Sequence, residues 1–232
     1  MALPIWGTAE GAWDAIAGLK TLSARQPEQT AADLDAIFRA GATPEGLQGR
    51  FQGMLVMTTQ GPLDGLARRL SSAWMPWLGK RIDEAAGAGD NLLTPGAARA
   101  ARLVWPRYPF RPVEPGILSA FDFRTYTAPG VADEDRVVLK IDYDIDLNPR
   151  FLIRNILDEL AEVGHQTYLG KVHLRQGGAW KTVGFFALRP SPYQQPLDDQ
   201  FKIWGTEEVT EEPAPAVPRR QPRKRGGKAR PA

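Results

Sequence analysis

The segment from Val137 to Asp146 constrains the fold more than any other part of the chain. In VVLKIDYDID, one set of alternate positions is almost purely apolar and the other is mostly charged. Alternate residues of a strand point to opposite faces of a sheet. The pattern therefore predicts a half-buried antiparallel strand with its apolar face inward and its acids in water. The inward set is Val137, Leu139, Ile141, Tyr143 and Ile145; the outward set is Val138, Lys140, Asp142, Asp144 and Asp146.

The three alternating aspartates also raise the alternatives of a calcium site or an acid–base pair. A calcium loop that begins at Asp142 needs glycine at its sixth position and glutamate at its twelfth. Those positions hold Leu147 and Ile153, so no metal is expected here. A pair of carboxylates for glycoside cleavage stays open, but it requires a cleft and one raised pKa.

Hydrophobic periodicity and turn residues predict the other elements. Asn148 as N-cap, Pro149 at the first helical position and Gly164 as the stop make 149–163 the clearest expected helix. Thr30 is the expected cap of an earlier helix. The predicted strands are 49–59, 77–84, 118–127, 136–146, 167–175 and 179–189. The predicted helices are 9–24, 30–41, 62–73 and 149–163. Residues 87–91 are expected to form a turn, and the proline-rich residues 95–117 a surface crossing with one helical turn or short strand around 101–105.

Charge and composition exclude several classes of protein. The chain has no cysteine, which excludes disulfides, thiolate nucleophiles and cysteine-type zinc sites. The last twenty residues hold seven basic residues and no acid, which leaves 22 basic and 27 acidic residues in 1–212, a net charge of −5. A basic nucleic-acid groove on the body is therefore disfavoured. No signal peptide or membrane span is expected, and the predicted location is cytoplasmic.

Neither histidine has a partner at metal-ligand spacing, so both His165 and His173 are expected at the surface. The chain also lacks the nucleophile elbow, the phosphate-binding loop and the dinucleotide fingerprint. No catalytic residue, metal or cofactor is predicted.

The aromatic residues on predicted strands favour a binding function. Most belong to a core, but a closed barrel of short strands can hold one small ligand. Arg124 and Tyr126 share a strand face and would fix a carboxylate or hydroxyl head group if that face points inward. The candidate ligand-binding residues are Phe51, Leu55, Met57, Arg124, Tyr126, Tyr143, Tyr168, Trp180 and Phe186.

Two segments carry a resemblance to a known family. The segment PEGLQGRFQGMLVMTTQGPLDGL, followed by WLGKRID, and the later ILDELAEVGHQTYLGK and GFFALR resemble the two modules of the GXWXG-type bacterial and fungal proteins. Phe51 stands where that family has tryptophan. The resemblance implies a lipocalin-like, or calycin-like, barrel and no settled activity. The first module is matched at Gly49, Phe51, Gly53, Gly61, Pro62, Leu63, Asp64, Gly65, Leu66, Trp77, Gly79, Lys80 and Arg81.

Together these features predict one α+β domain, an antiparallel lipocalin-like β-barrel buttressed by helices. The expected organisation is a helical segment 1–44, a barrel 45–190, an extension 191–212 and a disordered basic tail 213–232. The expected function is non-catalytic binding of a small hydrophobic or amphipathic molecule, such as a fatty acid, isoprenoid or pigment.

Two alternatives stay open. An adaptor would bind an acidic protein, RNA or a membrane surface through its tail, and an enzyme would use Arg124, Tyr126 or an aspartate at the barrel mouth. The basic tail residues are Arg219, Arg220, Arg223, Lys224, Arg225, Lys228 and Arg230.

Overall fold

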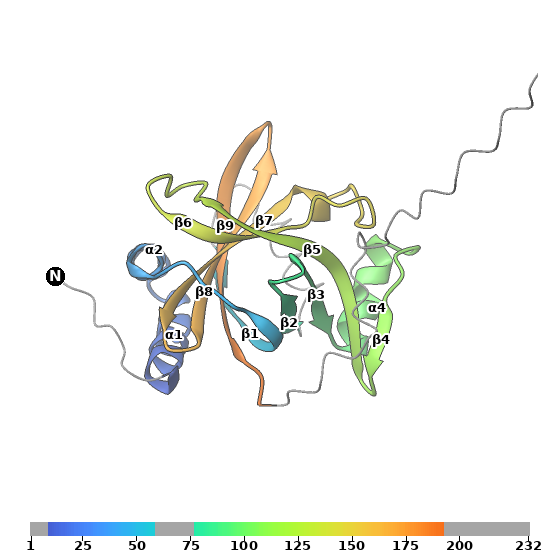
Figure 1. The fold of residues 1–232 in the computed structure, drawn as a ribbon, viewed down its shortest axis with the longest axis horizontal. Helices are drawn as coiled ribbons and strands as arrows, with labels where there is room; N and C mark the ends of the chain where they lie inside the picture. The colour runs from blue at the N-terminus through green and yellow to red at the C-terminus, as the bar shows by residue number, and fades with distance from the viewer. Residues whose placement is uncertain (1–8, 59–76, 193–232) are drawn as a thin grey trace, which may run out of the picture.

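The computed structural model describes residues 9–58 and 77–192. The predicted helix 62–73, most of the 191–212 extension and the basic tail lie outside the described residues. The described chain forms a closed eight-stranded antiparallel β-barrel with three α-helices, which confirms the predicted α+β barrel (Figure 1). The barrel strands are β1 (Gln48–Thr58), β2 (Trp77–Asp83), β3 (Ala88–Leu93), β5 (Ile117–Pro129), β6 (Val137–Asp142), β7 (Ile156–Gly164), β8 (Thr167–Gln176) and β9 (Ala179–Pro190).

The barrel closes where β3 pairs with β5. Around the barrel, the strands pair in the order β3-β2-β1-β9-β8-β7-β6-β5. The pairing of β3 with β5 completes the ring. The seam is antiparallel and places Gly89 opposite Phe123 and Leu93 opposite Leu118. Closure leaves no free barrel edge, which removes the unpaired backbone groups that promote aggregation. The short strand β4 (Arg111–Glu114) pairs with the first part of β5 outside the ring.

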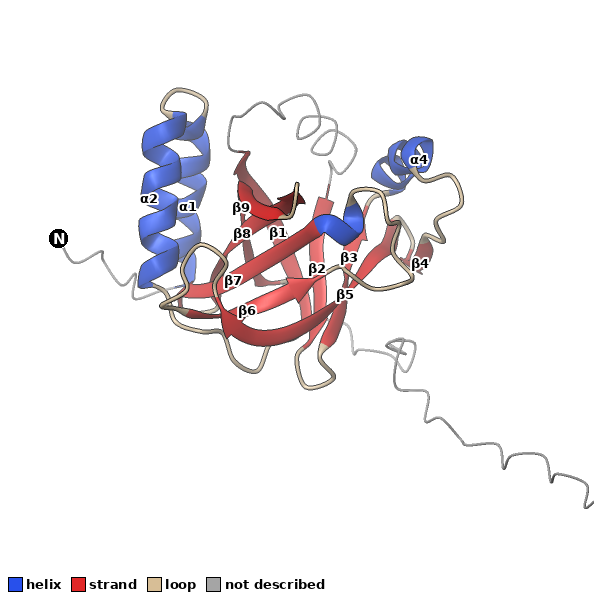
Figure 2. Cartoon of the chain, turned by 90° about the horizontal axis from the view of Figure 1, so that it is seen from above, coloured by secondary structure: helices blue, strands red, loops and turns tan. Residues whose placement is uncertain are grey.

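A second core lies between the barrel and an N-terminal helical hairpin. Helices α1 (Ala9–Ser23) and α2 (Pro27–Ala40) lie side by side against the outer face of the barrel (Figure 2). They bury Ile16, Leu34 and Phe38 against the outward side chains of Val138 and Leu169. The hairpin is therefore held to the sheet by apolar packing of the kind that dominates protein stability.

The third helix and a 3-10 turn lie at one end of the barrel. Helix α4 (Pro95–Val104) starts immediately after β3, with Thr94 as its N-cap, and the 3-10 turn η1 (Ile153–Asn155) precedes β7. Because the barrel strands alternate in direction, β3 ends and β7 begins at this same end, which we call the α4 end (Figure 2). A helix is present near 101–105, as predicted, but the prediction that 95–117 is a surface crossing is wrong: β4 follows α4, and Trp105, Tyr108 and Phe110 are buried in the core.

The prediction of a helix over 149–163 is wrong. Residues Ile156–Gly164 form β7, between β6 and β8, and only the 3-10 turn η1 is helical in this segment. The expected turn at 87–91 is also wrong, since it lies almost entirely within β3. Helix α2 begins with Pro27 in its first turn, and Thr30 is buried within it instead of capping it.

The outward face of β6 is more buried than its sequence predicts. The predicted strand to residue 146 is wrong, since β6 ends at Asp142. Val137 was predicted to point inward but is exposed, and Val138 is buried under the helical hairpin. Lys140 is also buried, while Leu139, Ile141 and Tyr143 fill the barrel interior as predicted. Asp142, Asp144 and Asp146 form ion pairs with arginines, and among them only Asp146 is almost fully exposed.

Candidate functional site

Four polar side chains meet inside the barrel, where the rest of the wall is mostly apolar. They are Lys80 on β2, Asn91 on β3, Tyr143 just after β6 and Asp158 on β7. Each is at least 95% buried. Each strand contributes its polar residue at an inward position between apolar ones, so the antiparallel register brings them together near the α4 end.

These four residues, here called the Lys80 cluster, share a compact set of hydrogen bonds. The Lys80 ammonium donates to Asn91 Oδ1 and to Asp158 Oδ2, each at 3.0 Å, and to the Tyr143 hydroxyl. The Tyr143 hydroxyl donates in turn to Asp158 Oδ2 at 3.0 Å. The Asn91 amide donates to the Phe121 carbonyl at 3.0 Å, which fixes the orientation of the Asn91 side chain.

Aromatic rings surround the Lys80 ammonium. Its Nζ lies 5.1–5.4 Å from the ring centroids of Trp77, Phe123, Tyr143 and Phe186, within the range of cation–π attraction. Trp77 also donates its indole N–H to Asn91 Oδ1 at 3.2 Å. Trp77 is only partly buried and stands at the start of β2, so it connects the Lys80 cluster to the solvent at the α4 end.

Burial dominates the acid–base behaviour of the Lys80 cluster. Removal of water lowers the pKa of Lys80, and the neighbouring Asp158 carboxylate offsets only part of this effect. Burial also raises the pKa of Tyr143 well above its ordinary value, and the Asp158 charge raises it further. Tyr143 therefore stays protonated and serves as a hydrogen-bond donor in the barrel interior.

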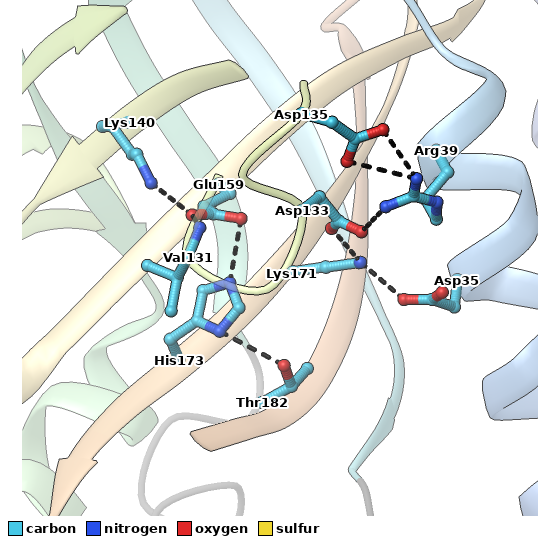
Figure 3. Close-up of polar contacts among 10 residues, drawn as sticks. All are labelled: Asp35, Arg39, Val131, Asp133, Asp135, Lys140, Glu159, Lys171, His173 and Thr182. Atoms are coloured by element: carbon cyan, nitrogen blue, oxygen red, sulfur yellow. Dashed lines mark hydrogen bonds and ion pairs between the residues drawn. The ribbon is translucent and has the colours of Figure 1, made fainter. Parts of the chain in front are cut away.

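A second polar cluster lies on the outer face of the barrel, beneath the loop between β5 and β6 (Figure 3). His173 Nε2 is 3.1 Å from Glu159 Oε2, and His173 Nδ1 is 3.2 Å from the Thr182 hydroxyl. Lys140 and the backbone N–H of Val131, at 2.6 Å, both donate to Glu159 Oε1. The carboxylate, imidazole and hydroxyl follow the order of a hydrolase triad, but His173 and Glu159 are fully buried. We interpret this arrangement as a support for the loop.

The environment of Glu159 keeps it ionised. Burial alone would raise its pKa, but His173, Lys140 and the Val131 N–H together lower the pKa to about 2. The prediction that His173 lies at the surface is wrong. Its ring points away from the barrel interior, as expected, yet it is fully buried.

Ion pairs attach the helical hairpin to the same loop. Lys171 Nζ on β8 is 2.5 Å from both Asp133 in the loop and Asp35 on α2. Arg39 on α2 lies 2.5 Å from Asp133 and 2.9 Å from Asp135 (Figure 3). Burial opposes ionisation of Asp133, but Lys171 and Arg39 outweigh it and lower its pKa.

Five of the nine residues predicted to bind a ligand lie on the inward face of the barrel. Phe51 and Tyr168 pack edge to face, with ring centroids 5.8 Å apart. Tyr143 and Phe186 contact Lys80, and Leu55 pairs with Phe186 across β1 and β9. The structure therefore confirms only that these five side chains face the interior of the barrel.

The other four predicted residues lie elsewhere. Met57 packs in the core under the helical hairpin. Arg124 and Tyr126 point outward, where Arg124 pairs with Asp142 at 2.9 Å and Tyr126 is 44% exposed. Trp180 lies on the hairpin between β8 and β9, with its ring 5.4 Å from the Arg175 guanidinium. The prediction that Arg124 and Tyr126 bind a head group inside the barrel is therefore wrong, because both side chains lie on the outer face.

Lys80, Asn91 and Asp158 were not among the residues predicted to bind a ligand. The signal for Lys80 was its place in WLGKRID, where it alternates with Leu78 and Ile82 at a strand spacing. The β3 and β7 partners were hidden because their segments were assigned to a turn and a helix. Within the described ranges, no group of three histidine, aspartate or glutamate side chains is placed to hold a metal ion. Nor does any helix there have the length and apolar character to cross a membrane.

Comparisons with known proteins add little to this geometry. No protein-family model matches the chain, and no curated protein matches it. The resemblance to GXWXG-type proteins therefore stays a prediction. Among solved structures, the chain is similar to a protein from Thermomonospora curvata at 16% identity and a TM-score of 0.41, over 77% of this chain and 99% of that one.

Proposed function

We propose that the barrel binds a small amphipathic molecule, with its polar head at the Lys80 cluster and its apolar body along the inner wall. The observation that carries this proposal is the buried Lys80 cluster, which lies among aromatic side chains in the barrel interior. Ligand sites in proteins commonly combine a mostly apolar lining with a few precisely placed polar groups. A carboxylate, carbonyl or hydroxyl head would accept from Lys80 by replacing one of its present partners, Asn91, Tyr143 or Asp158.

The position of Trp77 supports entry from the α4 end. Its indole contacts both Lys80 and Asn91 and reaches the solvent. Beyond the cluster, the wall continues with Phe51 and Tyr168, which present apolar surface to the body of the ligand. The binding needs no covalent chemistry.

Native mass spectrometry of the freshly purified full chain tests the proposal directly. We expect a copurified small molecule, or binding of an apolar anionic fluorophore to the emptied protein. If no molecule copurifies and such fluorophores fail to bind, the proposal is overturned.

A matched pair of tyrosine variants tests the location. Tyr143→Phe removes a buried hydroxyl from the cluster, and we expect fluorophore binding to weaken by roughly three- to tenfold, the value of one hydrogen bond. Tyr126→Phe removes an outward hydroxyl and should leave affinity unchanged. Equal effects of the two variants would place the ligand outside the barrel.

Replacement of the seven basic tail residues by glutamine separates this function from the adaptor alternative. Interior binding predicts unchanged fluorophore affinity in that variant. An adaptor predicts loss of a salt-sensitive interaction with an acidic partner, because exposed charges act through screened electrostatics.

A further inference from the structure

An exposed apolar patch with arginines around it lies at the α4 end. Leu103 is 88% exposed, Phe151 64% and Val104 45%, so these three side chains stand among the most exposed large apolar residues of the described chain. We refer to these three residues as the Leu103 patch. Surface apolar groups that gather in this way mark interaction sites more often than scattered ones do.

The geometry of α4 explains why Leu103 projects so far. The helix buries Ala97, Ala98 and Ala101 against the barrel. At 100° per residue, Leu103 falls opposite the centre of that buried face. Arg99 lies one turn before Leu103 on the same outward side, and Arg102 flanks it.

Phe151 belongs to the same surface because α4 is tied to its backbone. Trp105, which caps the helix, donates its indole N–H to the Phe151 carbonyl at 3.2 Å. Residues from the end of α4 and from the segment before η1 are thereby fixed next to each other. Arg150 precedes Phe151, Arg107 follows Trp105 by two residues, and both arginines are exposed.

The two chain segments that carry the patch contain arginines and no acid. Residues 94–113 contain no acid, and neither do residues 147–157. Among the described residues, no carboxylate forms an ion pair with Arg99, Arg102, Arg107 or Arg150. The acids that border these two segments are paired with cations elsewhere: Asp90 with Arg81, Glu114 with Arg50, Asp146 with Arg154 and Asp158 with Lys80.

We propose that the α4 end docks on an anionic lipid surface, with the Leu103 patch inserted among the lipid chains and the four arginines on the headgroups. Apolar insertion combined with electrostatic attraction to anionic headgroups is the mode by which interfacial elements bind membranes. The four arginines, which have no carboxylate partner among the described residues, match that surface, whereas an apolar protein groove would leave them without counter-charge. The proposal stands independently of a ligand inside the barrel, although it would place the Trp77 side of the barrel at the membrane.

Single cysteines test the orientation, because the natural chain has no cysteine. The full-length variants L103C, F151C and L22C are each labelled with a fluorophore that responds to polarity. Leu22 is 43% exposed on α1 and serves as the matched control. We expect a blue shift at positions 103 and 151 with vesicles of phosphatidylcholine and phosphatidylserine, no shift with phosphatidylcholine alone, and none at position 22. Absence of any shift, or an equal shift at position 22, overturns the proposal.

Vesicle sedimentation tests the energetics and separates the patch from the basic tail. Arg99→Gln combined with Arg107→Gln should weaken partitioning to anionic vesicles by roughly 25-fold, at about fivefold for each arginine. Leu103→Asp should weaken it at least about tenfold, whereas Leu22→Asp should not. All four positions are solvent-exposed, so folding is preserved. If the patch variants sediment like the natural chain, the tail or another surface carries the binding and the proposal is wrong.

Discussion

At the scale of single residues, the barrel interior is organised by one ion pair whose partners come from distant parts of the chain. Lys80 and Asp158 are 78 positions apart and meet at 3.0 Å in a region that excludes water. Removing one partner of a buried pair is costly because the other charge is left uncompensated, whereas apolar replacement of both is often neutral. We therefore expect the pair to contribute more to the specificity of the interior than to its stability.

This difference yields a direct prediction. Lys80→Met alone should lower the free energy of unfolding by about 3–5 kcal/mol, because Asp158 loses its counter-ion. The double variant Lys80→Met with Asp158→Leu should recover most of that loss. Urea denaturation of the single and the double variant measures the free energy of unfolding of each. If both variants are destabilised equally, the pair does not behave as a buried, coupled unit.

Glu159 predicts a specific acid sensitivity. Its folded-state pKa of about 2 lies below its ordinary value of 4.5, so its ionised form favours the folded state. This contribution is fully present above about pH 4.5 and is lost as the pH falls toward 2. The shift corresponds to roughly 3 kcal/mol. Denaturation curves from pH 6 to pH 2 should show a shallower decline for Glu159→Gln than for the natural chain, while the exposed Glu10→Gln retains the natural slope.

At the scale of elements, most strands could be predicted because their alternation is local. Strands β1, β2, β5, β6, β8 and β9 all appear within a few residues of the predicted bounds. Segment 156–164 failed because its leucines, glutamates and alanine favour a helix, and its caps fit one. As a strand, it buries Asp158 inward and Glu159 outward, each opposite a lysine that comes from another strand. Those lysine partners are set by tertiary structure, which local propensity does not contain.

The residues of the barrel interior also differ in whether local sequence patterns can reveal them. Phe51, Tyr143 and Phe186 could be found because bulky residues alternate on clear strands. Lys80 and Asp158 could not, since a charged residue is expected in water until its partner is known. Arg124 and Tyr126 were misplaced because alternation shows which residues share a face but not which face is inside.

The attachment of the helical hairpin gives the prediction at this scale. Lys171 is buried between Asp35 and Asp133 and joins α2, the β5–β6 loop and β8. Lys171→Met should leave two carboxylates without their shared cation and release the hairpin before the barrel. Hydrogen exchange should therefore rise in 9–40 and 130–136 and change little in β2 and β3. A uniform rise across all of these segments would contradict this view of a locally attached element.

At the scale of the whole molecule, closure of the barrel determines both the interior and the proposed functions. The Lys80 cluster combines residues from β2, β3, β7 and the end of β6, so it exists only when the β3–β5 seam is formed. The same seam places α4 directly after β3 and thereby orients the Leu103 patch. A defect at the seam should thus disturb the interior site and the proposed lipid surface together.

Gly89 is where this dependence can be tested. A Cβ at this position would lie 2.2 Å from the Arg81 carbonyl and 2.4 Å from the Phe123 ring, so backbone and core would have to move apart. Gly89→Ala should lower the free energy of unfolding by about 1–3 kcal/mol and weaken fluorophore binding in the interior. Gly18→Ala, in an exposed turn of α1 with no atom within 4 Å, should instead add about 0.5–1 kcal/mol. If Gly89→Ala destabilises the protein yet leaves hydrogen exchange in β3 and β5 unchanged, the seam is not the point on which the interior depends.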